Sequence, residues 1–421
     1  MRKLALLFFI TINAFVCNAH KKNSSQISKG DPVKSKSVIS AKATSSAVFP
    51  IIAWVGLPQY FTTLAKYQEL KASGMTQSYC PFTDSNAMEA ALNMAQKVGI
   101  KLFVACPELA SKPEETVKRF MNHPALAGYY ISDEPGASAF PGLSLLIKRI
   151  EAIDKKHLCY VNLFPNYAVE SQLGAKTYSD YVNIYMQQVS TKIISFDHYP
   201  VIGDKSESIR PEWYHNLEII ADAAKKYNKP FWAFALSVAF SPYPLPTLAS
   251  LRLQVYSDLA YGAQAIQYFT YFTLTDPNNN FNNAPLDPQG KLTVSYGRVQ
   301  QMNKEIKSLS GVFLGAKMIS VAHTGNTIPF GTKPLTKLPK PIKSLKTQGL
   351  GAVVSVLKKN GISYMVIVNR DIASPMNLQM VCGTGVSRVL KNGSVAAIKS
   401  NTRLSVGPGD VSIYKWADAL N

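Results

Sequence analysis

The sequence predicts an α/β fold: a parallel (β/α)8 TIM barrel followed by a small antiparallel β-sandwich domain. Short apolar runs alternate eight times with amphipathic stretches between residues 49 and 312. These runs lack polar alternation, as expected of parallel strands that are buried on both faces. From about Gly315 the pattern changes to short strands separated by turn signals, which is typical of antiparallel sheets. We therefore expect two domains, at residues 49–312 and 313–421.

The chain begins with a processing signal. Arg2 and Lys3 precede the apolar run 4–16, which is too short to span a bilayer, and residues 17–19 fit a signal-peptidase site. We expect residues 1–19 to be removed and the protein to be exported to a periplasm or the cell exterior. The alternative is a membrane-anchored lipoprotein with a lipid on Cys17. Residues 20–48, rich in Ser and Lys, are expected to form a flexible linker.

The eight barrel strands are expected where the apolar runs lie: 50–56, 75–81, 100–106, 126–132, 158–163, 193–197, 230–237 and 265–272. Amphipathic patterns predict helices at 85–98, 112–121, 142–156, 212–227 and 247–262. Roughly 250 residues is the usual size of such a barrel, and residues 50–312 fit it. The competing fold is an open doubly wound sheet. It normally carries a glycine-rich phosphate loop after its first strand, where Gly56-Leu57-Pro58 stands here.

The C-terminal strands are expected at 318–323, 351–358, 361–369, 376–381, 386–390, 394–399 and 402–414. Asn360-Gly361 and Asn392-Gly393 predict hairpin turns. Residues 333–346, with regularly spaced lysines and several prolines, are expected to form an exposed loop.

The net charge of +19 is unevenly distributed. Residues 1–49 carry 8 Lys/Arg and 1 acidic residue, residues 50–312 carry 23 and 22, and residues 313–421 carry 14 and 3. Because the central part is nearly neutral, the basic excess says little about the substrate of the central site. No nucleic-acid partner is expected. The basic C-terminal part could attract acidic polysaccharide or an anionic membrane, or it could serve solubility alone.

Four cysteines follow the leader, at 80, 106, 159 and 382, without metal-like spacing. Cys80 and Cys106 lie in neighbouring predicted strands, so a disulfide and buried free thiols both remain open. No His-x-His or HExxH motif occurs. No metal and no cofactor are expected.

The chemistry of a parallel barrel lies at the C-terminal ends of its strands. The run Leu-Ala-Gly-Tyr-Tyr-Ile-Ser-Asp-Glu-Pro, residues 126–135, ends on two carboxylates. Asp133 and Glu134 are therefore the first catalytic candidates, against the alternative of a solvated pair at a helix start. Other polar and aromatic strand-end residues are expected to bind substrate: Trp54, Tyr79, Asn162, His198, Tyr199, Trp232, Ser237, Gln267 and Tyr271. Aromatic faces with a few convergent polar groups suit a carbohydrate.

Two of these motifs resemble a known group. Gly-Tyr-Tyr-Ile-Ser-Asp-Glu-Pro, residues 128–135, resembles the fourth-strand ending of clan A glycoside hydrolases, notably family 42 β-galactosidase-like barrels. Ser-Phe-Asp-His-Tyr-Pro, residues 195–200, resembles the sixth-strand ending of related barrels, including exported proteins of gut Bacteroidetes. The resemblance implies that Glu134 is the acid/base and that Asp133 replaces the asparagine that contacts the sugar 2-hydroxyl.

The sequence departs from that pattern at the seventh strand. Retaining members of the clan place a glutamate nucleophile there, whereas residues 231–240 offer only Ser237. Three explanations stay open. Asp197 or Glu212 takes the second carboxylate role, the enzyme inverts with a wider carboxylate gap, or catalysis has been lost.

The predicted function is a glycoside hydrolase acting on oligo- or polysaccharide. The alternatives are a catalytically inactive barrel that binds glycans and a surface adhesion or scaffold protein held by the basic domain.

Overall fold

A computed structural model describes residues 48–203 and 207–418, which belong to one compact unit. The predicted signal peptide and residues 20–47 of the predicted linker lie outside the described residues. The division into domains at residues 312 and 313 stays a prediction.

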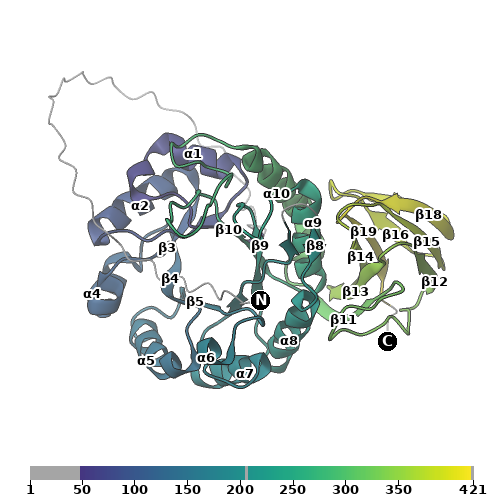
Figure 1. Ribbon diagram of the computed structural model, residues 1–421, viewed down its shortest axis with the longest axis horizontal. Helices are drawn as coiled ribbons and strands as arrows, with labels where there is room; N and C mark the ends of the chain where they lie inside the picture. The colour runs from purple at the N-terminus through teal and green to yellow at the C-terminus, as the bar shows by residue number, and fades with distance from the viewer. Residues whose placement is uncertain (1–47, 204–206, 419–421) are drawn as a thin grey trace, which may run out of the picture. The chain divides into compact units, whose positions relative to one another are not determined.

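Eight parallel strands close into a barrel in the order β1-β10-β9-β6-β5-β4-β3-β2 (Figure 1). They are β1 (Ile51–Trp54), β2 (Gln77–Ser78), β3 (Lys101–Val104), β4 (Leu126–Asp133), β5 (Leu158–Leu163), β6 (Ile194–Phe196), β9 (Phe231–Leu236) and β10 (Ala265–Phe269). Each strand starts within the range that the sequence predicted for it. The predicted barrel is therefore confirmed, and the competing prediction of an open doubly wound sheet is wrong.

Helices surround the barrel (Figure 1). They are α1 (Leu64–Ala72), α2 (Ser85–Val98), α3 (Glu108–Ser111), α4 (Pro113–Phe120), α5 (Phe140–Glu151), α6 (Glu170–Leu173), α7 (Tyr178–Gln188), α8 (Trp213–Lys226), α9 (Leu248–Ala260) and α10 (Val294–Phe313), with 3-10 turns η1 (Gln59–Phe61) and η2 (Ala137–Ala139). Among the described residues, no helix is both long and apolar enough to cross a membrane.

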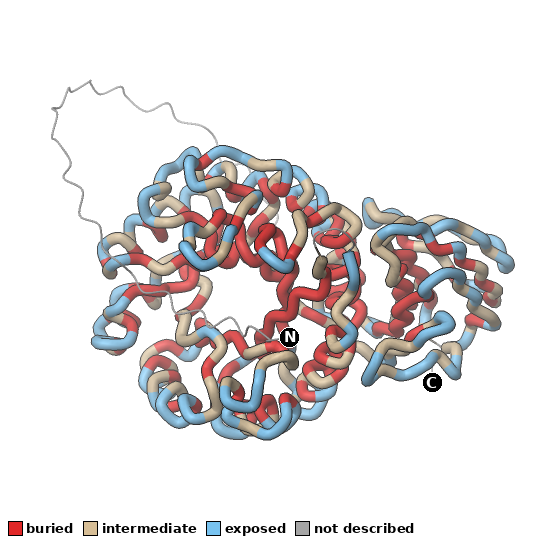
Figure 2. The backbone as a smooth tube through the Cα atoms, in the orientation of Figure 1, coloured by how far each residue is buried: buried red, intermediate tan, exposed pale blue. Residues whose placement is uncertain are grey.

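Local chemistry explains why these segments are helical. The Asp84 side chain accepts hydrogen bonds from the first free N–H groups of α2, at Asn86 and Ala87, and Gly99 ends the helix with a φ of 68°. Buried residues recur every three or four positions along α2, which turns one face toward the strands. Figure 2 shows the result as buried strands inside helices that are exposed on their outer sides.

A short antiparallel hairpin interrupts the regular alternation after β6. It consists of β7 (Val201–Ile202) and β8 (Ser208–Ile209) and leads into α8. The segment therefore extends the sixth strand-to-helix connection at the end of the barrel where the strands terminate.

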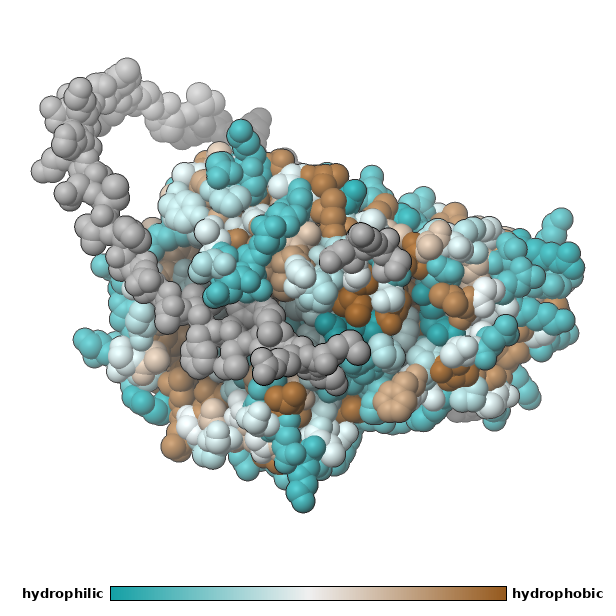
Figure 3. All heavy atoms as spheres, in the orientation of Figure 1, coloured by the Kyte–Doolittle hydropathy of each residue, from teal (hydrophilic) through white to brown (hydrophobic). Residues whose placement is uncertain are grey.

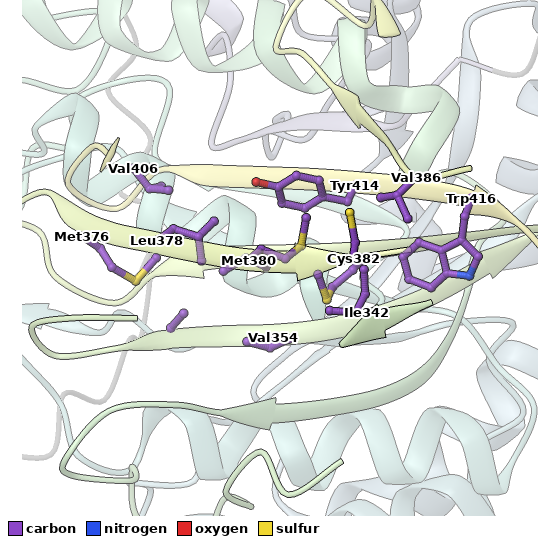
Figure 4. Close-up of a cluster of buried hydrophobic side chains, with 13 residues drawn as sticks. Ile342, Val354, Met376, Leu378, Met380, Cys382, Val386, Val406, Tyr414 and Trp416 are labelled. Carbon is purple, nitrogen blue, oxygen red and sulfur yellow. The ribbon is translucent and has the colours of Figure 1, made fainter. Parts of the chain in front are cut away.

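The C-terminal part contains two antiparallel sheets, as predicted. One has six strands in the order β11-β13-β14-β19-β16-β17, and the other has three in the order β12-β15-β18. Their bounds are β11 (Lys317–His323), β12 (Ile342–Thr347), β13 (Ala352–Lys359), β14 (Ile362–Asn369), β15 (Met376–Cys382), β16 (Ser387–Val389), β17 (Val395–Ala397), β18 (Asn401–Val406) and β19 (Val411–Ala417). Buried side chains of both sheets form a shared core (Figure 4). On the barrel side, β13 and β14 contact α9.

Two predictions for this part were wrong in detail. Residues 342–346, expected within a loop, belong to β12, because Ile342 enters the core while the intervening lysines face out. The strand expected at 402–414 is two strands, β18 and β19, since Gly407-Pro408-Gly409 turns the chain between the sheets. The hairpin turn at Asn360-Gly361 is confirmed, with φ values of 51° and 73°.

All four cysteines of the described residues are buried free thiols. Cys80 and Cys106 therefore do not form the disulfide that the sequence left open. Burial raises the pKa of Cys80 to about 12, so this thiol stays protonated and unreactive at neutral pH.

Candidate active site

A β-bulge positions the last residues of β4. Tyr130 pairs with Tyr160 on β5, and Asp133 pairs with Asn162, so three steps along β4 match two along β5. The extra residue lies between Tyr130 and Ser132 and reverses the alternation of side chains. As a result, both Tyr130 and Asp133 face the interior of the barrel: Tyr130 packs against the ring of Trp54, and Asp133 accepts a hydrogen bond from Asn162.

Glu134 is the first residue beyond the bulged strand. Its φ of 43° is uncommon for a residue with a side chain. Its N–H donates to the carbonyl of Asn162 at 2.8 Å, which continues the sheet by one bond while the chain turns. Strained backbone of this kind is frequent at functional sites, where the surrounding structure holds it in place.

Asn162 connects two carboxylates. Its side-chain nitrogen donates to Asp133 at 3.1 Å and to Asp197 at 2.9 Å, and its oxygen accepts from the Ser195 hydroxyl at 2.9 Å. Because the oxygen is occupied by Ser195, the amide must present its N–H groups to the carboxylates. The buried amide is therefore held in one orientation.

A deeper layer holds Ser195 in turn. The Gln267 nitrogen donates to the Ser195 hydroxyl at 2.9 Å, and the Tyr160 hydroxyl donates to the Gln267 oxygen at 2.7 Å. Gln267 and Ser195 are fully buried. Gln267, which the sequence predicted to bind substrate, instead contacts Ser195 and through it helps to fix the Asn162 amide.

Glu134 and Asp197 form a carboxyl pair joined by a side-chain hydrogen bond. Burial and the charges of Asp197 and Asp133 raise the pKa of Glu134 well above its usual range. Burial also raises the pKa of Asp197, to about 6, while bonds from Asn162, Tyr199 and Glu134 oppose that rise. Glu134 therefore holds the proton of the pair near neutral pH, and Asp197 carries the charge.

Asp133 is a third member of this carboxylate group. Taken as a whole residue, Asp133 is exposed at the strand end. Its carboxyl, however, accepts a hydrogen bond from Asn162 inside the barrel. Burial of that carboxyl and the charge of Asp197 raise the pKa of Asp133 to about 7, against the bond from Asn162. Ionising all three neighbouring carboxyls is unfavourable because their negative charges repel, so their titrations are coupled.

Aromatic side chains surround the group on the β1–β4 side. The ring of Tyr79 lies 4.3 Å from that of Trp54 and 4.2 Å from that of Tyr130. The charge of Asp133 contributes to the raised pKa of both tyrosines, although burial is the larger cause. The predicted residues Trp54 and Tyr79 are thus brought next to Asp133.

Other predicted residues lie away from the carboxylates. Trp232 packs inside the barrel against Phe103 and Tyr160, near the start of β9, a position that favours packing over substrate contact. Ser237 is fully buried and donates to the carbonyl of Thr270. Tyr271 is also fully buried.

Glu212 and His198 occupy the loops that follow β6. Glu212 precedes α8 as its N-cap residue, and its backbone carbonyl accepts from Asn166 at 2.9 Å. None of the described contacts joins its carboxyl to Glu134. His198 is 1% exposed, and Tyr199 lies beside Asp197, to which it is hydrogen-bonded.

Sequence reasoning did not select Tyr130, Tyr160 or Ser195. Tyr160 precedes Asn162 by two positions and therefore shares its face of β5, which is a signal that strand alternation offers. Tyr130 carried no such signal, because the bulge breaks the alternation of β4. Among residues 48–203 and 207–418, no group of three or more His, Cys, Asp or Glu side chains is suited to hold a metal ion.

Comparisons with known proteins agree with this architecture. The glycoside hydrolase family 42 model, described as β-galactosidase, matches residues 154–309. The match includes the motif at 195–200 and excludes the motif at 128–135. No curated protein matches the sequence. The resemblance to family 42 is confirmed, whereas similarity to exported proteins of gut Bacteroidetes stays a prediction.

Solved structures share the fold at low sequence identity. A catalytic mutant of a family 42 β-galactosidase from G. stearothermophilus aligns with a TM-score of 0.64 at 9% identity, over 89% of this chain and 99% of that chain. The β-galactosidase of Bacillus circulans sp. alkalophilus gives 0.59 at 10% identity, over 88% and 99%. A family 39 glycoside hydrolase from the gut symbiont Bacteroides cellulosilyticus gives 0.52 at 9%, over 88% and 81%. This chain spans 60% of the length of another neighbour, a β-galactosidase from the psychrophilic Marinomonas.

The chain is a (β/α)8 barrel with a C-terminal β-sandwich, and its residues 154–309 match the family 42 model.

Proposed function

We propose that the protein hydrolyses O-glycosidic bonds in an oligo- or polysaccharide, with Glu134 as general acid/base and Asp197 as the second carboxylate. The observation that carries the proposal is the hydrogen-bonded pair of these two side chains at the carboxyl ends of β4 and β6. Two carboxyls in different protonation states are what glycoside hydrolysis requires.

The protonation states assign the roles. Glu134 keeps its proton near neutral pH and donates it to the glycosidic oxygen as the bond to the anomeric carbon breaks. Asp197 stays ionised, because Asn162 and Tyr199 donate hydrogen bonds to its carboxylate, and it attacks the anomeric carbon. Water, deprotonated by Glu134, then releases the sugar and restores both carboxyls.

Direct contact between the carboxyls favours retention of configuration. Inverting enzymes separate their carboxyls by about 6.5–9.5 Å to admit a water, whereas retaining enzymes use about 5–5.5 Å. A pair within hydrogen-bond reach leaves no room for that water. We propose that Asp133, whose carboxyl shares the Asn162 amide with Asp197, binds a hydroxyl next to the reacting carbon.

The test compares three carboxyl variants with the wild type. Release of sugars from a panel of plant and host glycans is followed by mass spectrometry, together with p-nitrophenyl β-galactoside. We expect Glu134→Gln and Asp197→Asn each to lose at least about 100-fold in rate. Glu212→Gln, the other sequence candidate, should keep its rate.

Two further readouts sharpen this test. Melting curves check that the variants fold. Glu134→Gln should be at least as stable as the wild type at neutral pH, because the raised pKa of Glu134 shows that its carboxyl is less stable in the folded protein than in the unfolded chain at that pH. The anomer formed first, observed by NMR, reports retention or inversion. A rate unchanged in Glu134→Gln would sink the proposal.

One observation favours a second candidate, a catalytically inactive barrel that binds glycans. Ser237 follows β9, where retaining clan members carry a nucleophile, and its hydroxyl is buried on the carbonyl of Thr270. This candidate expects glycan affinity without turnover in the wild type and no change of affinity in Glu134→Gln.

We further propose export, on the strength of the leader motif at residues 1–19. Cell fractionation with Cys17→Ala separates the two routes. A lipid-anchored protein would leave the membrane fraction in this variant, whereas a protein cleaved after Ala19 would be soluble in both forms.

A further inference from the structure

Arg210, which follows β8, is held between two aromatic rings. Its guanidinium lies 4.7 Å from the ring centre of Tyr167 and 5.6 Å from that of Tyr243, and it donates to the Tyr243 hydroxyl at 3.2 Å. A side-chain hydrogen bond also links the two tyrosines. A guanidinium stacked in this way presents its N–H groups at its edge in a fixed geometry.

The charge of Arg210 has no carboxylate partner among the described residues. Its Nε is buried and has no hydrogen-bond acceptor there either. By contrast, three other arginines of the barrel each have a glutamate partner: Arg119 with Glu89, Arg149 with Glu114 and Arg252 with Glu305. A fourth, Arg298, donates to the carbonyl of Pro246. A buried cationic donor without an acceptor is costly, and a bound anion would supply one.

His198 adds a second unsatisfied group at the same place. It is 1% exposed, and within the part of the chain that the structure describes neither ring nitrogen has a hydrogen-bond partner. Its ring contacts that of Tyr167 edge-on at 5.0 Å. Burial, and then the charge of Arg210, lower the pKa of His198, so the neutral ring has one N–H to donate.

This group, the Arg210 site (His198, Tyr167, Arg210 and Tyr243), adjoins the carboxylates. His198 follows Asp197 directly in the chain. Tyr199, hydrogen-bonded to Asp197, packs edge-on against Tyr243 at 5.8 Å between ring centres. Asp197 and Glu134 also contribute to the raised pKa of Tyr167, which burial dominates. A substrate held by Asp197 therefore reaches the Arg210 site with a neighbouring substituent or sugar.

We propose that the Arg210 site binds an anionic group of the glycan, either the carboxylate of a uronic acid or a sulfate ester. The oxygens of both groups can accept hydrogen bonds from the N–H groups at the edge of a guanidinium. They can also accept a hydrogen bond from the N–H of His198. The proposal rests on the proposed function and names its substrate class as acidic rather than neutral saccharide.

The charge of the C-terminal part is consistent with an acidic polymer. Residues 313–421 carry 14 Lys/Arg and 3 Asp/Glu. In the three-stranded sheet, the exposed Lys346 and Arg403 flank Gln379 in register. Figure 3 shows hydrophilic side chains projecting from the end that the sandwich forms. Such a surface attracts polyanions by long-range electrostatics.

The experiment measures binding of three matched probes to the full chain: galactose, galacturonic acid and galactose 6-sulfate, by NMR titration or calorimetry. We expect at least one acidic probe to bind about 10-fold more tightly than galactose. Arg210→Gln should abolish this preference and leave galactose affinity unchanged. Arg210→Lys should retain part of it, since lysine keeps the charge and loses the stacked fork.

Arg403→Gln is the control, because it removes one positive charge from the sandwich without touching the Arg210 site. It should keep the full preference. Tighter binding of galacturonic acid or of the sulfate identifies which anion the site takes, and either result supports the proposal. Equal binding of all three probes, or a preference that survives in a folded Arg210→Gln, overturns it.

These results are independent of turnover. Failure of the proposed function would appear as absence of hydrolysis on every substrate, whatever the probes bind. Failure of the present inference would appear as hydrolysis or binding that does not distinguish acidic from neutral sugars.

Discussion

At the scale of single residues, the site depends on how protons are distributed among three coupled carboxyls, Asp133, Glu134 and Asp197. The sequence placed Asp133 and Glu134 at a strand end and left Asp197 and Glu212 as alternatives. The structure joins Asp197, not Glu212, to Glu134. Sequence alone could not choose between them, because both follow β6 and their side-chain directions depend on the loop.

The coupled carboxyls predict a bell-shaped dependence of kcat/KM on pH. On the acid side the rate should fall near pH 6, where Asp197 takes up a proton. On the alkaline side it should fall as Glu134 loses its proton, well above the usual range of a glutamate. Asp133→Asn removes a neighbouring negative charge, so the alkaline limb should move down by about one pH unit.

Rate measurements across the pH range check this prediction, with Glu212→Gln as the control whose profile should match the wild type. An alkaline limb that stays in place in Asp133→Asn would contradict the coupling of Asp133 with Glu134.

At the scale of elements, strand positions were predictable and irregularities were not. The eight barrel strands were found because each is a local apolar run between helical patterns. The bulge in β4 was missed, since one extra residue leaves composition unchanged while it reverses which side chains face inward. The strand β12 was also missed, because its lysines hid the two apolar residues that pack inward.

The turn between β18 and β19 gives a testable case. Gly409 has a φ of 63°, and a Cβ placed there would lie 2.1 Å from the carbonyl oxygen of Ala249 in α9. Gly409→Ala should therefore destabilise the protein by about 2 kcal/mol or more, from backbone strain and from displacement of the sandwich against α9.

Gly361→Ala is the matched control. Gly361 has a φ of 73°, and a Cβ placed there would meet no neighbouring atom within 4 Å. Gly361→Ala should therefore lower the free energy of unfolding by only about 1 kcal/mol, through backbone strain alone. Urea denaturation of both variants measures the difference, and equal losses would show that the contact with α9 contributes nothing.

At the scale of the whole molecule, a partly buried ion cluster connects the barrel to the sandwich. Glu305 of α10 is 4% exposed at its side chain and accepts from Arg252 and Tyr256 of α9. Lys391 of the sandwich lies 3.2 Å from Glu305 and 2.7 Å from Asp410. Despite burial, the bonds from Arg252, Gln301 and Tyr256 lower the pKa of Glu305 to about 2.

Removing this charge should weaken the whole unit. Glu305→Gln removes one of the two carboxylates, Glu305 and Asp410, that Arg252 and Lys391 share, and we expect a loss of about 3 kcal/mol at pH 7. Because the folded pKa is depressed, this stability is present above the unfolded pKa and is lost as pH falls toward 2. The difference in the free energy of unfolding between Glu305→Gln and the wild type should therefore become smaller between about pH 5 and pH 2.

Denaturant unfolding at several pH values measures this gap. Glu114→Gln serves as the comparison, because its pair with Arg149 is exposed to solvent and should contribute little to stability. A gap in Glu305→Gln that is independent of pH would refute the assignment of the stability to the ionised carboxylate.

The sequence by itself determined the order of elements, the barrel and the location of acidic residues at strand ends. These depend on local patterns of burial and on the rule that parallel strands need crossovers. Only the tertiary structure decided that Glu134 pairs with Asp197, that Asn162 is oriented by Ser195 and Gln267, and that Arg210 lies beside His198. The reason is physical: these contacts join residues from different strands, and register, bulge and loop geometry set their distances.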